Sequence, residues 1–409
     1  MDKIIIIGGG IIGGSILYHL YREGYGGRVV VLERKSQLSQ ESTSLSAGAF
    51  RNIWSTKVNL KLTNYSINAY KNFHEELGTN IGFEQIGYLF TYYEKEFQAI
   101  KDFKHVWDEN GVRTELLKPE EIKNYVPGFI PTIDHIDPEV NEVLNMKPIA
   151  GGLFGPDCGI FNPTTASNRY FEYTKEKYPQ KVEIKLNSEV KKIIFSGEKT
   201  IGVELIDGTI IEGDLVILAA GAFSGDLLKR SVDDEKYHIP VVPWKRMLFT
   251  VKMPNIEGFG KIPMTIIDNG VYFHPEKGNL IVGRADPDQP FGYDYSPDPK
   301  YYEEQMNYYM AARIPGMEYC RIISPQSMWG GLYEHNTKDK NGIIGFHSKL
   351  KNLFIATGFS GHGVMEAPGV GLSVAEKILT GEFKTIKDVE DLKFERFENN
   401  QLIKETIVI

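Results

Sequence analysis

Four short apolar runs, distributed over the whole chain, predict strands that are buried on both faces. They lie at residues 4–7, 28–32, 214–221 and 352–358, and the first consists of four isoleucines. Continuous apolar runs of this length are typical of parallel strands with both faces covered. Between the first two runs, residues 11–21 carry isoleucine and leucine at helical spacing. The pattern therefore predicts an α/β fold with a parallel sheet.

The middle of the chain is expected to add a second domain. Residues 240–251, 271–275 and 279–283 are predicted strands of another sheet, and residues 301–314 a helix. The fold class that we expect is a discontinuous Rossmann-like nucleotide-binding domain with an inserted α+β substrate domain on a mixed or antiparallel sheet. The expected nucleotide-binding segments are 1–80, 145–235 and 340–409, and the expected substrate, or cap, segments are 81–144 and 236–339.

Composition narrows the functional classes. The chain has 409 residues, a net charge of −8 and no lysine- or arginine-rich stripe, so nucleic acid and anionic membranes are not expected partners. The longest apolar stretch, 4–17, is too short and too rich in glycine to span a bilayer. The first strand starts so early that no signal peptide is expected, and we expect a cytoplasmic location. The two cysteines, Cys158 and Cys320, are far apart, so no disulfide framework, iron–sulfur cluster or metal site is expected.

A glycine motif follows the first strand directly. Gly8, Gly10 and Gly13 form G-x-G-x-x-G at the start of the predicted helix, and Glu33 ends the second strand twenty residues later. The first glycine permits a tight turn, the second lets a pyrophosphate approach the backbone, and the third lets helix and strand pack closely. The helix N-terminus favours phosphate, and Glu33 can accept hydrogen bonds from ribose hydroxyls. An acidic residue here argues against NADP, but this motif alone does not distinguish NAD from FAD.

Several motifs occur in an order that resembles the FAD-dependent D-amino-acid oxidase superfamily. The similarity is greatest to the sarcosine oxidase and glycine oxidase branch, which includes the β subunits of heteromeric sarcosine oxidases and L-proline dehydrogenases. The resemblance implies FAD rather than NAD, and oxidation of a C–N bond in a small amino acid or an N-methyl or imino acid. The motifs that carry it are Gly8-x-Gly10-x-x-Gly13, Glu33-Arg34, Asp157 with Pro163, Ala219-Ala220-Gly221 and the G-F-S-G-H-G stretch at 358–363.

The resemblance also implies which residues contact the cofactor. Small residues after the second strand, in the turn after 214–218 and in the stretch 358–363 let the backbone lie against a ligand. The expected FAD contacts are Gly8, Gly10, Ile11, Ile12, Gly13, Glu33, Arg34, Ser46, Ala47, Gly48, Val190, Ala220, Gly221, Gly358, Ser360, Gly361, His362, Gly363, Val364 and Met365.

The substrate side of the site is expected around Arg51. A guanidinium binds a carboxylate through two parallel hydrogen bonds, and Arg51 resembles the position from which family members reach the substrate. Its alternative role is a surface or interdomain salt bridge. His362 is expected at the N1/O2 edge of the flavin, and Tyr272, His274 and Trp329 at the border of the substrate cavity. The alternative for these four is a purely structural role.

Departures from the family pattern bear on the electron acceptor. Ile281 and Met365 stand where oxidase relatives carry lysines, and residues 330–335 lack the cysteine that binds flavin covalently in some of them. A cation near reduced flavin helps oxygen to accept an electron. We therefore expect non-covalent FAD and a dehydrogenase rather than an oxidase, with Met365 in the active site. Two alternatives stay open: a flavin-bearing subunit that passes electrons to a partner protein, and a redox-silent nucleotide-binding protein.

Overall fold

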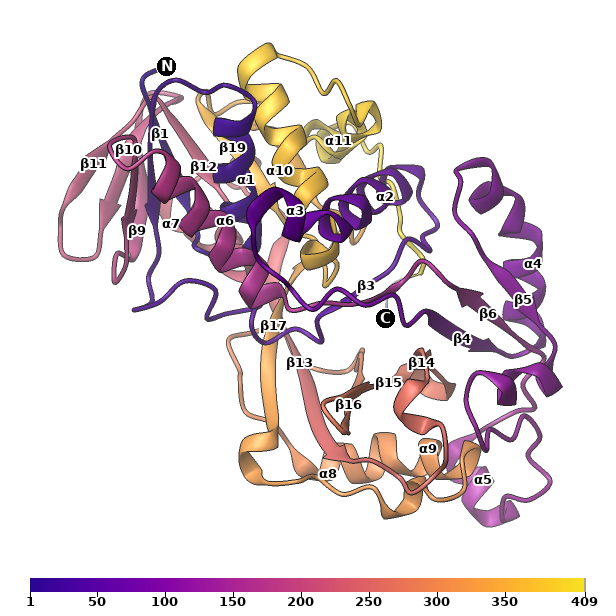
Figure 1. Ribbon diagram of the computed structural model, residues 1–409. Helices are drawn as coiled ribbons and strands as arrows, with labels where there is room; N and C mark the ends of the chain where they lie inside the picture. The colour runs from indigo at the N-terminus through magenta and orange to yellow at the C-terminus, as the bar shows by residue number, and fades with distance from the viewer. Residues whose placement is uncertain (408–409) are drawn as a thin grey trace.

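The computed structural model describes residues 1–407 and contains two large sheets, one above the other in Figure 1. The upper sheet has the strand order β18-β19-β12-β1-β2-β8. Its strands are parallel except β18, which is antiparallel to β19. This is the expected Rossmann-like sheet, with the strands β1 (Lys3–Ile7), β2 (Arg28–Leu32), β8 (Val182–Lys185), β12 (Leu215–Leu218), β18 (Ile343–Phe346) and β19 (Leu353–Thr357).

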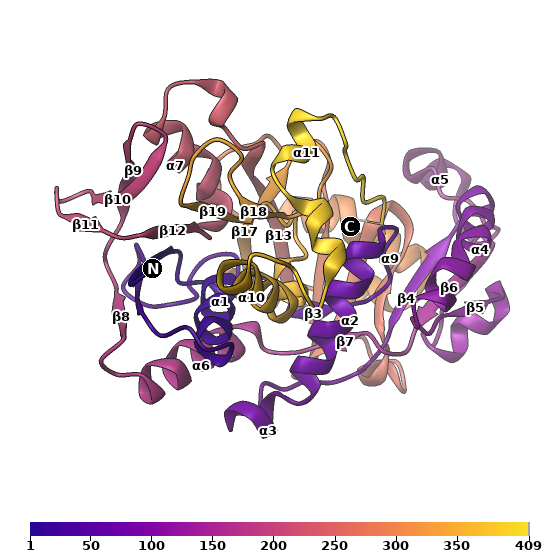
Figure 2. The ribbon, with the colours of Figure 1, turned by 90° about the horizontal axis from the view of Figure 1, so that it is seen from above.

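Alternation along β1 explains why its apolar run is continuous. Ile4 and Ile6 pack into one hydrophobic cluster, and Ile5 and Ile7 into another on the opposite face. The first cluster is completed by helices, of which α1 and α10 lie side by side in Figure 2. Burying one isoleucine side chain contributes about 1.5–3 kcal/mol, so each face holds its covering layer. The helices on the first face are α1 (Ile11–Arg22), α2 (Lys57–Lys71), α6 (Pro163–Lys177) and α10 (Gly363–Thr380).

The opposite face of the upper sheet is covered by a small antiparallel sheet and a short helix. The covering sheet has the strand order β11-β10-β9, and α7 packs beside it. These elements are β9 (Val190–Ser196), β10 (Lys199–Leu205), β11 (Ile210–Glu212) and α7 (Ser224–Ser231).

The lower sheet has eight strands in the order β17-β13-β16-β15-β14-β4-β6-β5. All its pairs are antiparallel except β14 with β4, so the expected mixed sheet is present. Leu248 and Tyr272 face the upper sheet, whereas Met247 and Phe273 face a separate core. The strands are β4 (Tyr88–Tyr92), β5 (Glu115–Leu117), β6 (Gly151–Gly155), β13 (Val241–Lys252), β14 (Met264–Ile266), β15 (Val271–Glu276), β16 (Asn279–Arg284) and β17 (Met328–Asn336).

Long strands and short helices complete the architecture. β13 and β17 pair from Val241 to Phe249 and run from one sheet toward the other (Figure 1). No helix among residues 1–407 is long and apolar enough to cross a membrane. The remaining helices and strands are α3 (Phe73–Leu77), α4 (Glu94–Glu109), α5 (Pro138–Leu144), α8 (Pro299–Tyr302), α9 (Tyr308–Arg313), α11 (Glu395–Glu398), β3 (Ala49–Phe50) and β7 (Gly159–Ile160).

One predicted boundary shifts in the structure. We expected the chain to leave the substrate segment near residue 145, but β6 pairs with β4 in the lower sheet, so the chain leaves this sheet only after Gly155. β6 is rich in glycine, and its pairing depends on a strand about sixty residues away rather than on a local pattern. The division into the two sets of segments stays a proposal, with this change.

Helix α10 begins at Gly363, inside the glycine-rich G-F-S-G-H-G stretch. Pro368 lies within it and cannot donate a hydrogen bond to the carbonyl four residues before it, that of Val364. The Tyr70 hydroxyl donates to this carbonyl oxygen at 2.6 Å instead. A side chain from α2 therefore satisfies the group that proline leaves unpaired.

Candidate active site

A cavity of about 630 Å³ lies between the two sheets. Its wall includes Ile7 and Leu32 at the carboxyl ends of β1 and β2. Arg246, Leu248 and Tyr272 contribute from the lower sheet. A ligand at the carboxyl ends of parallel strands is the usual arrangement in open α/β sheets. The lower sheet therefore closes the place where this fold binds nucleotides.

The glycine motif forms a cradle at one end of the cavity. Gly8 has φ +122°, and a Cβ atom there would lie 2.2 Å from the carbonyl oxygen of Ala219. A Cβ on Gly13 would lie 2.1 Å from the Gly8 carbonyl oxygen. Around Gly10, the N-cap of helix α1, the nearest atom to such a Cβ is Thr43 Oγ1, at 3.2 Å. This hydroxyl accepts from the Ile11 N–H at 3.1 Å. Tight packing behind Gly8 and Gly13, with Gly10 on the cavity wall, fits a pyrophosphate at the helix N-terminus.

Two backbone N–H groups hold the Glu33 carboxylate in place. One carboxylate oxygen accepts from the Gly9 N–H at 2.8 Å, and the other from the Lys35 N–H at 2.8 Å. Each oxygen retains a lone pair, and the side chain lines the cavity. Beside it the guanidinium of Arg34 lies 3.7 Å from the ring centroid of Phe223. The donors and acceptors at this end fit the adenosine part of FAD.

The G-F-S-G-H-G stretch turns sharply after β19. Gly358, Ser360 and Gly361 all have positive φ, of +84°, +48° and +96°. Glu334 on β17 holds this turn, because its carboxyl group accepts from Thr357 Oγ1 at 2.5 Å and from the Gly358 N–H at 2.8 Å. Burial raises the pKa of Glu334 to about 7. The carboxyl group that holds the turn expected at the flavin therefore changes its protonation state near neutral pH.

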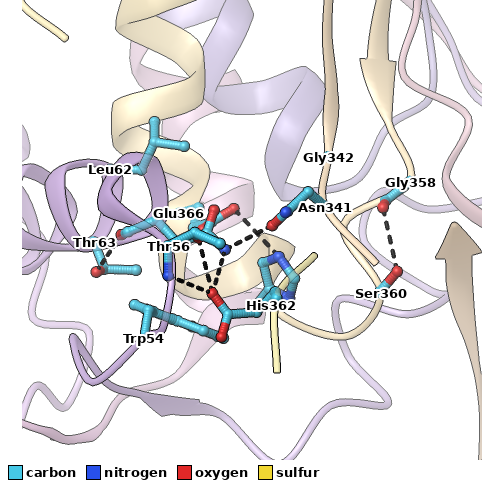
Figure 3. Close-up of polar contacts among 12 residues, drawn as sticks. Trp54, Thr56, Leu62, Thr63, Asn341, Gly342, Gly358, Ser360, His362 and Glu366 are labelled. Carbon is cyan, nitrogen blue, oxygen red and sulfur yellow. Dashed lines mark hydrogen bonds and ion pairs between the residues drawn. The ribbon is translucent and has the colours of Figure 1, made fainter. Parts of the chain in front are cut away.

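His362 and Glu366 form a buried pair at the start of α10 (Figure 3). His362 Nε2 lies 4.0 Å from Glu366 Oε2, and the imidazole is 4.8 Å from the Trp54 ring. Burial lowers the pKa of His362 to about 3 and raises the pKa of Glu366 well above its ordinary value. At neutral pH the pair therefore consists of a neutral imidazole and a neutral carboxylic acid. His362 lines the cavity as a hydrogen-bonding group rather than as a cation.

Arg51 lines the cavity without a carboxylate partner among residues 1–407. Its guanidinium donates to the carbonyl oxygens of Ile53 and Ile407, and it lies 3.6 Å from the Trp54 ring centroid. The side chain is 3% exposed. The salt bridge that was its alternative role is absent from the described chain, so the charge is available to an anionic ligand.

Glu405, near the end of the chain, fastens the segment next to Arg51. Its carboxylate accepts from the N–H groups of Ser55 at 2.9 Å and Thr56 at 3.0 Å, and from their hydroxyls at 2.5 and 2.8 Å. Thr56 is the N-cap of α2, and its own side chain makes no capping bond. Burial raises the pKa of Glu405, but the hydrogen bonds from Ser55 outweigh it and hold the pKa below its ordinary value. An ionised Glu405 therefore caps α2 and holds the tail against Arg51.

Most residues predicted from sequence lie on the cavity wall. Their roles remain predictions, and the residues are Gly8, Gly10, Ile11, Ile12, Glu33, Arg34, Ser46, Ala47, Gly48, Arg51, Val190, Ala220, Gly221, Tyr272, Ser360, Gly361, His362, Gly363, Val364 and Met365.

Four predicted site residues do not line the cavity. Gly13 packs behind Gly8, and Gly358 is held by Glu334 in the turn. His274 is buried with Nδ1 3.0 Å from the Pro275 carbonyl oxygen, and Trp329 donates to the Leu45 carbonyl oxygen at 3.0 Å. These two side chains are engaged by backbone groups, so we assign them to the surroundings of the cavity. Ile281 is also absent from the wall.

Sequence reasoning missed several wall residues from the lower sheet and its neighbours. They become neighbours only when strands that are distant in sequence pair. For Arg246 the sequence does contain a signal, since it is a charged residue inside the apolar run 241–251. No three metal-ligating side chains come together anywhere in the described chain. The missed residues include Trp54, Tyr88, Arg246, Leu248, Met264, Tyr333 and Glu334.

Comparisons with known proteins agree with this geometry. The family described as FAD dependent oxidoreductase (DAO) matches residues 3–377. The FAD-dependent oxidoreductase domain-containing protein 1 of Xenopus laevis is 30% identical, over 99% of this chain and 84% of that protein. The crystal structure of L-proline dehydrogenase from P. horikoshii has a TM-score of 0.82 and 28% identity, covering 98% and 99% of the two chains. Glycine oxidase from Geobacillus kaustophilus, at 20% identity and a TM-score of 0.76 over 97% and 99%, shares the fold.

Proposed function

The chain belongs to the FAD-dependent oxidoreductase (DAO) family, and on that premise we propose that it oxidises the C–N bond of a small amino acid or an N-methyl or imino acid. The resemblance expected from the motifs is thereby confirmed, and so is FAD as the cofactor. When bound, FAD supplies the two-electron acceptor for the reaction. The substrate carbon loses a hydride and its nitrogen a proton, and the product is an imine.

The observation that carries this proposal is the buried, unpaired guanidinium of Arg51 on the wall of the nucleotide cavity. An amino acid carboxylate would complete its charge-assisted hydrogen bonds. Apolar wall residues, among them Leu248 and Met264, exclude water around the reacting carbon. His362 is neutral and can accept a hydrogen bond from the substrate nitrogen, which an imidazolium could not do.

We extend the proposal to the electron acceptor and favour a dehydrogenase. Met365 lines the cavity where oxidase relatives carry a lysine. Among the described wall residues Lys229 is the one lysine, and it lies on α7 with its ammonium group 3.7 Å from Asp226. Ile281 does not line the cavity, so it supports a dehydrogenase less strongly than Met365 does.

Anaerobic reduction of the flavin tests the reaction. Sarcosine, glycine, D-alanine and L-proline are mixed with the FAD-loaded protein without oxygen, and loss of flavin absorbance is recorded. Reduction by at least one such compound supports the proposal, and a flavin that none of a broad amino and imino acid panel reduces contradicts it. Stopped-flow reoxidation then compares oxygen with an artificial acceptor, and faster reoxidation by oxygen would make the enzyme an oxidase. A second subunit remains a prediction, which copurification from the native source tests.

A further inference from the structure

A second arginine, Arg246, faces the same cavity without an anionic partner among residues 1–407. It lies on β13 and is 7% exposed. Its Nη1 donates to the Lys245 carbonyl oxygen at 2.9 Å, and its buried Nε has no partner in the described structure. The guanidinium carbon is 3.7 Å from the Trp244 ring centroid and 4.8 Å from that of Tyr333. Aromatic faces stabilise the cation, but they do not satisfy its N–H groups.

Other buried arginines in the chain are neutralised within the protein. Arg313 makes two hydrogen bonds of 2.7 Å to Asp268. Arg396 binds Asp339 through bonds of 2.7 and 3.1 Å. Leaving such a charge buried without a partner costs several kcal/mol, which explains why both are paired. Two buried arginines lack a carboxylate partner among residues 1–407, and both line the cavity: Arg51 and Arg246.

The two unpaired guanidinium groups lie near a common set of tyrosines. The Arg246 guanidinium carbon lies 4.8 Å from the Tyr333 ring centroid. Burial raises the pKa of Tyr333, and the positive charges of Arg246 and Arg51 oppose that shift. Tyr88 and Tyr272 line the same wall. The hydroxyls of all three make no hydrogen bond within the part of the chain that the structure describes. Three free donors and two cations on the wall of one cavity form an environment for carboxylate oxygens.

We propose that the substrate is a dicarboxylic amino or imino acid, whose second carboxylate binds Arg246 while its α-carboxylate binds Arg51. This inference rests on the proposed function and names its substrate class. A substrate with a neutral side chain would leave Arg246 buried and unpaired, and a site built around a charge discriminates strongly against a ligand that lacks the matching group. The FAD phosphates do not fill this role, because their cradle is formed by β1 and α1 on the other sheet.

The test compares ligands that differ by one carboxylate. Iminodiacetate is paired with sarcosine, and D- and L-glutamate with D- and L-2-aminobutyrate, in anaerobic flavin reduction. Glutarate is paired with butyrate as unreactive ligands, whose binding is followed by perturbation of the flavin spectrum. We expect the dicarboxylate of at least one reactive pair, and glutarate, to bind at least tenfold more tightly than its partner.

Arg246→Met removes the charge and keeps much of the volume. We expect it to weaken dicarboxylate binding at least tenfold and monocarboxylate binding much less, so the preference disappears. Arg246→Lys should retain part of it. The matched control is Arg284→Met on neighbouring β16, because Arg284 donates to Asn269 and Tyr301 and does not line the cavity. This control should keep the preference of the native protein.

Each result separates the two proposals. Reduction by monocarboxylates without any dicarboxylate preference overturns the inference and leaves the proposed function standing. Glutarate binding that requires Arg246, without reduction by any amino acid, supports the second anion site and overturns the proposed function. Loss of FAD from Arg246→Met, with no preference in the native protein, would identify the cofactor as the partner of Arg246 and overturn the inference. If the Met variant does not fold, the native ligand pairs and Arg246→Lys still decide.

Discussion

Replacing Glu334 by glutamine is expected to change how stability depends on pH. Burial raises the pKa of Glu334 from 4.5 to about 7 in the folded protein. Between these values the folded state retains a proton that the unfolded state releases, so this group makes stability fall as pH rises across that window. A shift of this size corresponds to roughly 3 kcal/mol at 1.36 kcal/mol per pKa unit. Glutamine does not titrate, so the variant should lose this part of the pH dependence.

Urea denaturation of the FAD-loaded protein at pH 5 and pH 8 measures the effect. The free energy of unfolding of Glu334→Gln, relative to the native protein, should rise by about 2.5 kcal/mol from pH 5 to pH 8. Glu382→Gln, at an exposed position, is the control for the substitution itself. The reasoning is refuted if the native protein and Glu334→Gln lose the same stability between the two pH values. In that case the carboxyl group is ionised throughout, and its bonds to Thr357 and Gly358 outweigh burial.

Three further predictions concern the site. Arg51→Lys should weaken carboxylate substrates by about 1.5–3 kcal/mol, roughly ten- to a hundredfold, while FAD affinity changes little; equal substrate affinity in anaerobic titrations would make Arg51 structural. Acid precipitation should release yellow FAD into the supernatant, because neither cysteine lines the cavity; flavin in the pellet would contradict non-covalent binding. Glu405→Ala should raise substrate KM and lower the melting temperature, because it removes the cap of α2. A lower melting temperature with an unchanged KM would show that the C-terminal tail does not influence substrate binding at Arg51.

The nucleotide end of the site was predictable because its signals are local. Four isoleucines, a glycine motif and Glu33 lie within thirty-three residues, and their order and spacing can be read directly from the sequence. The flavin turn was also predicted, but the start of α10 was not. That helix passes through Pro368 because the Tyr70 hydroxyl, nearly three hundred residues away in sequence, satisfies the carbonyl of Val364. Such a compensation has no signature near the proline.

The substrate end was harder to predict because its chemistry depends on pairing between distant strands. Arg246 looks like one charge in an apolar strand, and only the pairing of β13 with β16 and β17 places it beside Tyr333 and on the same wall as Tyr272. His274 and Trp329 were reasonable candidates by residue type. In the folded chain, however, backbone carbonyl groups engage both side chains outside the cavity. Residue type therefore identified the right strands but not the right positions on them.

The charge of the substrate end follows from burial as much as from composition. The chain is acidic overall, but Glu366 is held neutral by burial, and Glu334 is partly protonated near neutral pH. His362 adds no positive charge, because burial lowers its pKa to about 3. The fixed charges that remain on this part of the wall are those of Arg51 and Arg246. An acidic protein thus presents a positively charged pocket, and anionic substrates should bind there with an affinity that falls only weakly with added salt, because buried charges are screened little.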